Sequence, residues 1–85
     1  MPSRVPPFDP SAGEPDYLWV QVADHIAARI EAGELPPGAR LPRELDTAEE
    51  YAVSHNTIRR AFAELRRRGL VRTLPNKGTY VRGAG

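Results

Sequence analysis

The chain of 85 residues contains no cysteine, so neither a disulfide bond nor a thiolate metal site can stabilise its fold. No apolar run approaches the roughly 20 residues that span a bilayer, and the proline-rich start at residues 1–15 lacks a secretory h-region. We therefore expect a cytoplasmic protein. A chain of this length has room for one domain, whose core must provide the stability alone or with a second copy of the chain.

Residue patterns typical of enzymes and metalloproteins are also missing. The two histidines, His25 and His55, fall on different predicted helices, which argues against a metal site. The sequence offers no nucleophile–base pair and no phosphate-cradling glycine loop. We therefore expect no enzymatic activity and no cofactor.

The net charge of +1 conceals a strong separation of charge along the chain. Residues 1–54 contain four basic and ten acidic residues, whereas residues 55–85 contain eight basic residues and only Glu64 as an acid. Such separation predicts that a polyanion binds the C-terminal part. Clustered cations can also form a merely solvated face, so the local structure must decide between the two.

The first half of the chain predicts an arm, two helices and a connector. Residues 1–15 are rich in proline and are interpreted as a flexible or extended arm. Apolar residues at three- and four-residue steps then predict a helix from a cap at Asp16 to about Gly33. Residues 35–42 contain three prolines and predict a tight connector, followed by a short helix from Arg43 or Glu44 to Ala52.

The second half predicts a capped helix followed by a β-hairpin. Ser54 can cap a helix that runs to about Arg68, and Gly69 is suited to the left-handed residue after the helix end. The period then changes to two, which predicts strands at residues 70–74 and 79–82 joined by the loop 75–78. We predict a mainly α fold with a small hairpin, a winged helix-turn-helix at residues 16–82 followed by a tail at 83–85.

Two helices joined by the three-residue turn 52–54 form the helix-turn-helix pattern, in which the second helix enters the DNA major groove. Its leading residues carry polar or cationic groups suited to base edges and phosphates: Ser54, His55, Asn56, Thr57, Arg59 and Arg60. We add Arg43 from the preceding helix. From the hairpin we add Arg72, Asn76, Lys77 and Gly78, because a wing can follow the backbone or enter the minor groove.

Other conspicuous residues receive a structural interpretation. The run Arg66–Arg68 lies in the last turn of the predicted helix, where cations interact favourably with the helix dipole. Phosphate contact is the alternative for this run. Tyr17 and Trp19 are expected to pack in the core or a dimer rather than to stack on a partner.

The segment Asp16–Val81 resembles the winged-helix domain of the GntR (gluconate-repressor-like) family. The matching phrases are Tyr17–Asp24, Ile30–Pro42, Ala48–Ser54, Thr57–Ala61, Gly69–Val71 and Lys77–Val81. The resemblance implies a DNA-binding transcription regulator, commonly a repressor, that binds a palindromic operator as a dimer. It also implies DNA contacts for Ser54, Asn56, Thr57 and Arg59, with the Asn76–Lys77 wing tip in the minor groove.

The sequence departs from this family at several positions. Leu45 and His55 stand where the family has arginine, and Thr47 replaces a core leucine. Ala52 replaces the usual turn glycine, so it must either tolerate unusual backbone angles or shift the turn. Asp46 and Glu49 are expected to form a capping box.

Family members usually continue into a C-terminal effector domain, whereas this sequence ends four residues after the wing. We expect a one-domain regulator without its own effector site, and an isolated domain of a longer protein is the alternative. A winged-helix module that binds proteins rather than DNA is the alternative, since Leu45 removes an arginine used on DNA.

Overall fold

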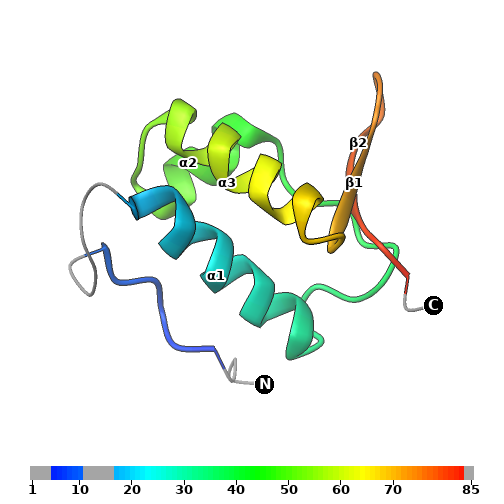
Figure 1. Ribbon diagram of the computed structural model, residues 1–85, viewed down its shortest axis with the longest axis horizontal. Coiled ribbons are helices and arrows are strands. Elements are labelled where there is room, and N and C mark those ends of the chain that lie inside the picture. The colour runs from blue at the N-terminus through cyan, green and yellow to red at the C-terminus, as the bar shows by residue number, and fades with distance from the viewer. Residues whose placement is uncertain (1–4, 11–16, 84–85) are drawn as a thin grey trace.

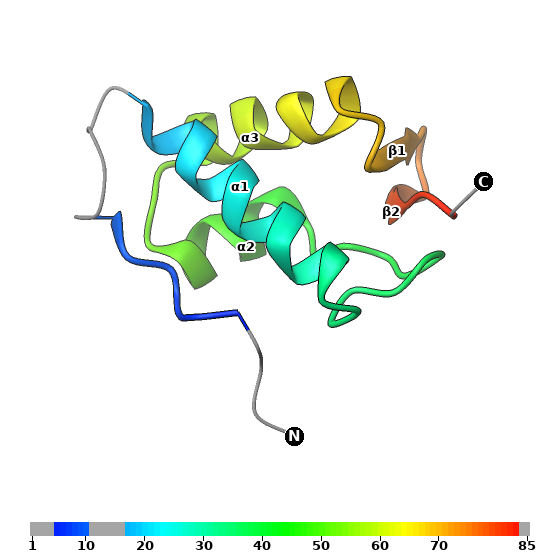
Figure 2. The same cartoon turned by 60° about the horizontal axis from the view of Figure 1, so that its bottom comes forward.

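The computed structural model describes residues 5–10 and 17–83 as three helices and a two-stranded antiparallel sheet (Figure 1). The elements are α1 (Leu18–Glu31), α2 (Glu44–Tyr51), α3 (His55–Arg67), β1 (Val71–Leu74) and β2 (Gly78–Val81). Helix α3 packs against α1 and α2, and the hairpin projects from its C-terminal end (Figures 1 and 2). The predicted winged helix-turn-helix is thus confirmed. No helix among the described residues is long and apolar enough to cross a membrane.

One face of α3 forms the centre of the core. Ile58, Ala61, Phe62 and Leu65 are at most 1% exposed, and their three- and four-residue spacing places them on a single stripe. The stripe packs against buried residues of the other elements: Val22, Ala23 and Ile26 of α1, Ala48 and Tyr51 of α2, Leu41, Val71 and Val81. Burying this stripe leaves the opposite face of α3 exposed.

The start of α2 differs from the expectation of a capping box. The helix begins at Glu44 after an extended Arg43 that makes no side-chain cap hydrogen bond. Asp46 therefore lies inside the first turn, and the capping box predicted for Asp46 and Glu49 was wrong. Thr47 is 3% exposed, and its hydroxyl donates to the carbonyl of Arg43 at 2.9 Å, which satisfies the polar group in the core.

The turn between α2 and α3 retains its geometry without glycine. Ala52 adopts the left-handed conformation at φ 56° and ψ 43°. The Val53 N–H donates to the carbonyl of Ala48 at 3.0 Å, and Ser54 then caps α3 as predicted. Ala52 therefore tolerates the unusual angles instead of shifting the turn.

Helix α3 ends and the hairpin begins through local signals that the sequence predicted. Gly69 has φ 78°, and the N–H of Leu70 donates back to the carbonyl of Leu65 at 3.0 Å. The strands pair from Val71 opposite Val81 to Leu74 opposite Gly78. The loop is therefore one residue shorter than predicted, because Gly78 belongs to β2.

The connector joins the hairpin, a pairing that the sequence analysis did not predict. The N–H of Leu41 donates to the carbonyl of Thr79, and the N–H of Val81 donates to the carbonyl of Ala39, both at 2.8 Å. An isolated bridge also links Arg40 to Tyr80. β2 is therefore bonded on both edges, which fixes the wing relative to the helices.

The N-terminal segment that the structure describes, residues 5–10, lies along α1 and α2 (Figure 2). Phe8 makes edge-on ring contacts with His25 and Tyr51, at centroid distances of 5.6 and 5.0 Å. His25 Nε2–H donates to the carbonyl of Pro6 at 2.7 Å, while its Nδ1 accepts from the Tyr51 hydroxyl at 2.7 Å. This part of the predicted arm is extended and packed against the core. The predicted cap, Asp16, lies outside the described residues, and Tyr17 precedes α1 without a side-chain cap.

The left-handed Ala52 yields a stability prediction. Ala52→Gly relieves the steric cost of that conformation but increases the flexibility of the unfolded chain, so we expect a net stabilisation of about 0.5–1 kcal/mol. Ala63→Gly, in the exposed middle of α3, is the matched control and should destabilise by about 1 kcal/mol. Urea denaturation measures both changes. Loss of stability in both variants would contradict the strain at Ala52.

Candidate nucleic-acid interface

The N-terminal turn of α3 is organised by Ser54. Its Oγ accepts from the backbone N–H of Thr57 at 3.1 Å and lies 2.9 Å from the Thr57 hydroxyl. The cap fixes where the helix starts and satisfies one of its free N–H groups. The side chains of His55, Asn56, Arg59 and Arg60 that follow are exposed, and Thr57 is half-buried. The predicted leading residues are therefore presented on the open face of α3.

An acidic residue that the sequence analysis missed lies in the same region. Glu44 Oε1 is 3.0 Å from His55 Nε2, and both side chains are partly exposed. This contact ties the first turn of α2 to the first residue of α3. The eleven-residue separation of the two positions gives no local sequence signal for the pair, and it depends on how the turn folds.

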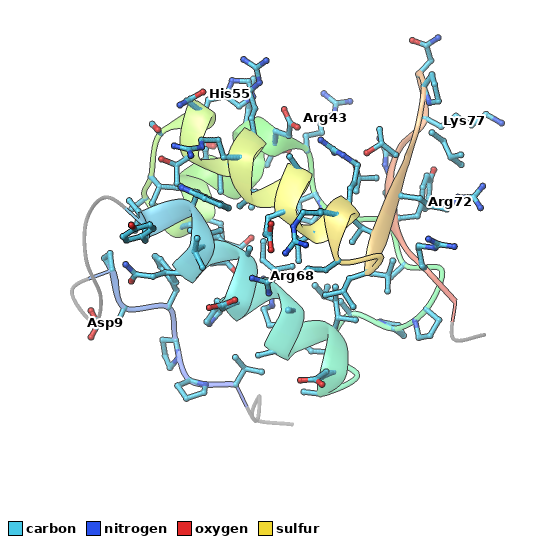
Figure 3. All side chains as sticks on the ribbon, viewed as in Figure 1. Asp9, Arg43, His55, Arg68, Arg72 and Lys77 are labelled. Atoms are coloured by element: carbon cyan, nitrogen blue, oxygen red, sulfur yellow. The ribbon has the colours of Figure 1, made fainter. Side chains whose placement is uncertain are left out.

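A groove between the start of α2 and the wing brings five of the predicted residues together. It is lined by Arg43 and His55 on the helical side and by Asn76, Lys77 and Gly78 on the wing. The labelled His55, Arg43 and Lys77 lie along one edge of the molecule, with Lys77 near the wing tip (Figure 3). Residues far apart in the sequence thus converge on one surface rich in positive charge.

A second, shallow groove runs along the outer face of α3. Its walls include Asn56, Arg59, Arg60 and Arg66, and it shares Glu44 and Thr73 with the groove beside the wing. We call the two grooves together the basic surface. Asn offers an amide that can pair with adenine, and the arginines offer donors for guanine or phosphate. This chemistry suits a nucleic acid better than an apolar ligand.

Arg72 is not brought into the basic surface. Side chains alternate along a strand, so Arg72 lies opposite Tyr80 on one face of the hairpin while Thr73 and Thr79 face the other way. Arg72 lines a different hollow, with Tyr80 and Arg82, and points away from the helices (Figure 3). The sequence analysis grouped it with Lys77 because neighbouring wing residues look equivalent when the face is unknown.

The wing tip requires glycine at its base. Asn76 has φ 62° and Gly78 has φ 137°, both in the left-handed half of the map. A Cβ on Gly78 would lie 2.7 Å from Nε of Arg40, whose side chain occupies this space. Arg40 is therefore a cation of the basic surface that the sequence analysis missed, because only the long-range pairing of the connector places it there.

The arginines at the end of α3 differ in their partners. Arg67 and Arg68 both bind Glu64, through contacts of 2.7 Å, and Arg68 also binds Asp24 of α1 at 2.8 Å. These hydrogen bonds from Arg67 and Arg68 hold the pKa of Glu64 at about 2. Arg66 instead donates to the Thr73 hydroxyl at 3.0 Å. Arg67 and Arg68 are therefore held in ion pairs, while their interaction with the helix dipole stays a prediction.

The expected packing of the aromatic residues at the start of α1 is only partly observed. Tyr17 is 57% exposed, so it is not a core residue. Trp19 is half-buried and lies under Arg60. Within the described residues, no group of three or more histidines and acids is arranged to hold a metal ion.

Known proteins resemble this chain in sequence. Residues 18–81 match the gntR family of bacterial regulatory proteins. The chain is 38% identical over 73 residues to the HTH-type transcriptional regulator Rv1152 of Mycobacterium tuberculosis, covering 86% of this chain and 59% of that protein. It is also 38% identical over 65 residues to the Escherichia coli mannosyl-D-glycerate system repressor MngR, covering 76% of this chain and 27% of that one. The chain thus spans less than two thirds of the length of either relative.

Solved structures show the same fold. The DNA-binding domain of AraR in complex with operator ORX1 superposes with a TM-score of 0.71 at 32% identity, covering 74% of this chain and 76% of that one. YtrA of Sulfolobus acidocaldarius, a GntR-family transcription factor, superposes with a TM-score of 0.80 at 24% identity, covering 94% of this chain and 84% of that one.

The ion pairs of Glu64 predict how stability depends on pH. Its folded-state pKa of about 2 lies below the ordinary value of 4.5, so the pairs stabilise the fold above about pH 4.5 and this contribution is lost as the pH falls toward 2. Glu64→Gln should therefore lower the thermal midpoint at pH 7 and have little effect near pH 2. Glu49→Gln, on α2, is the control. An equal deficit of Glu64→Gln at both pH values would contradict the ion-pair account.

Proposed function

Because the chain belongs to the GntR family of bacterial regulatory proteins, we propose that it binds double-stranded DNA with sequence specificity and regulates transcription. The N-terminal half of α3 enters the major groove, which is wide enough for a helix. The convergence of α3 and the wing on the basic surface is the observation that carries the proposal. Neither element alone would hold DNA in a defined register.

The residues at the start of α3 have different roles in DNA recognition. Asn56 and Arg59 occupy the open face near the capped helix start, where they meet base edges. The hydroxyl of Ser54 is engaged in the cap, so its contribution is to place the helix rather than to read a base. His55 reaches DNA beside Glu44, and this acid limits how closely a phosphate approaches that side chain.

The wing supplies a second contact along the same duplex. Asn76 and Lys77 are exposed at the tip, and the glycine at position 78 leaves room for the Arg40 side chain beside it. An exposed, cationic tip suits the minor groove or the sugar-phosphate backbone. Arg40 and Arg43, between the tip and α3, contribute cations along the path of the backbone.

Relatives support the wider biological proposal. MngR is named a repressor, and the AraR domain is bound to an operator. We propose that this protein is likewise a repressor that acts on the bacterial nucleoid in the cytoplasm. Each chain has a single recognition helix, so we expect two copies to bind the two halves of a palindromic operator.

One observation favours a protein-binding module as a second candidate. Leu45 is 64% exposed at the rim of the basic surface, where an apolar side chain is unusual on a DNA-binding face. A partner with an acidic surface and an apolar pocket would cover it. Equal, weak binding to every duplex would favour this alternative over DNA recognition.

Two variants separate base reading from phosphate contact. DNA sites are first selected from a random pool by the wild-type chain, and a scrambled duplex serves as the reference. Arg59→Ala should cost about 1–3 kcal/mol on the selected duplex and much less on the scrambled one. Lys77→Ala should weaken both duplexes similarly and reduce the salt dependence of binding.

Fluorescence anisotropy at several salt concentrations provides these affinities. Arg67→Ala, which removes a cation already bound to Glu64, is the matched control and should bind nearly as well as the wild type. If Arg59→Ala loses the same affinity on both duplexes, Arg59 contacts only phosphate. Failure of the wild type to select any site would contradict the proposed function itself.

A further inference from the structure

The only tryptophan of the chain, Trp19, lies beneath a cation of the basic surface. Cζ of Arg60 is 4.7 Å from the centroid of the Trp19 ring, so the guanidinium of α3 is held over the first turn of α1. We propose that Trp19 is a positioning residue that holds Arg60 ready to bind a phosphate of the DNA strand on the α1 side of the recognition helix. This inference rests on the proposed function.

The partners of the arginines at the C-terminal end of α3 show how Arg60 differs from them. Arg67 and Arg68 are bound to the carboxylate of Glu64, which neutralises their charge and occupies their donors. Arg66 donates to a threonine of the wing. Arg60 has instead an aromatic ring as its observed contact within the described residues.

An aromatic ring can hold a guanidinium and leave free the N–H donors and the positive charge that bind a phosphate. A cation–π contact uses the charge of the guanidinium and does not need its N–H groups as hydrogen-bond donors, so these donors stay available. The ring also leaves the positive charge unneutralised. A carboxylate would order the side chain equally well but would repel the phosphate. The Trp19–Arg60 contact therefore orders the arginine and keeps it active toward an anion.

The position of Arg60 indicates which part of DNA it meets. Arg60 follows Asn56 by four residues, so both lie on the exposed face of α3, and both line the same groove. Its ring partner belongs to α1, whereas Arg66 on the same helix reaches toward the wing. Arg60 therefore flanks the base-reading residues on the side away from the wing. A helix seated in the major groove meets a sugar-phosphate strand there.

Ordering the arginine in advance explains why the ring matters to affinity. A free arginine side chain loses several rotatable bonds when it binds, and that entropy opposes association. Over Trp19 much of this freedom is lost before DNA arrives. The result is a sequence-independent phosphate contact by Arg60, on the side of α3 that faces α1.

The test uses the full chain and a labelled duplex of arbitrary sequence, with affinity measured by anisotropy across a salt series. Arg60→Ala should weaken binding about tenfold at low salt and reduce the slope of log affinity against log salt by about one. Trp19→Leu keeps the charge but frees the arginine, so we expect a loss of about threefold with most of the slope retained. Trp19→Phe, which keeps a ring, should restore part of that loss.

The double variant Trp19→Leu/Arg60→Ala provides the decisive comparison. If Trp19 acts through Arg60, the double variant binds no more weakly than Arg60→Ala alone. Arg67→Ala should leave both affinity and slope close to the wild type. Unlabelled duplex should also change the fluorescence of the single tryptophan in the wild type, because a DNA phosphate then binds the guanidinium of Arg60 beside the ring.

Three results would overturn the inference. Additive losses in the double variant would show that Trp19 acts independently, and an unchanged slope in Arg60→Ala would show that Arg60 meets no phosphate. If Trp19→Phe restores no affinity for DNA and also lowers the thermal midpoint, the role of Trp19 is purely structural. If the wild type binds no duplex at all, the proposed function fails; if it binds and these variants behave otherwise, only the role of Trp19 and Arg60 fails.

Discussion

The arrangement of the molecule depends on burial of one stripe of α3. Ile58, Ala61, Phe62 and Leu65 are removed from water by α1, α2 and the start of the hairpin, which all pack on this helix. Burying side chains of this size contributes about 1.5–3 kcal/mol each for the large ones. A helix with one face fixed in the core has its other face fixed toward solvent. The exposure of Asn56 and the arginines of α3 is therefore a consequence of core packing.

The position of the wing depends on a second constraint, the pairing of the connector with β2. Backbone hydrogen bonds from Leu41 and to Ala39 hold the strand from its outer edge, while β1 holds the other. The same pairing buries Leu41 and brings Arg40 under Gly78. The distance between the wing tip and α3, and hence the shape of the basic surface, is set by contacts remote in sequence. The charge of this surface follows from the sequence, because acids are concentrated before residue 55 and cations from that residue onward.

The sequence predicted those features that are encoded locally. Helical periodicity, the Ser54 cap and the glycine at position 69 each act within a few residues, and the observed elements agree with them to within one or two residues at most boundaries. What was missed depends on tertiary folding: the Glu44–His55 contact, the face of Arg72 and the aromatic support of Arg60. The predicted start of α2 at Glu44 is confirmed, and the expected capping box failed because Asp46 then lies inside the first turn of the helix.

The most direct test of the account is to map backbone amide chemical shifts of the isotope-labelled chain by NMR as a selected duplex is added. The account predicts the largest changes at residues 54–60 and at the wing tip, 75–78, with α2 beyond its first turn and the C-terminal half of α1 nearly unaffected. Changes centred on those acidic helices, or none at saturating duplex, would show that the basic surface is not where this protein binds DNA.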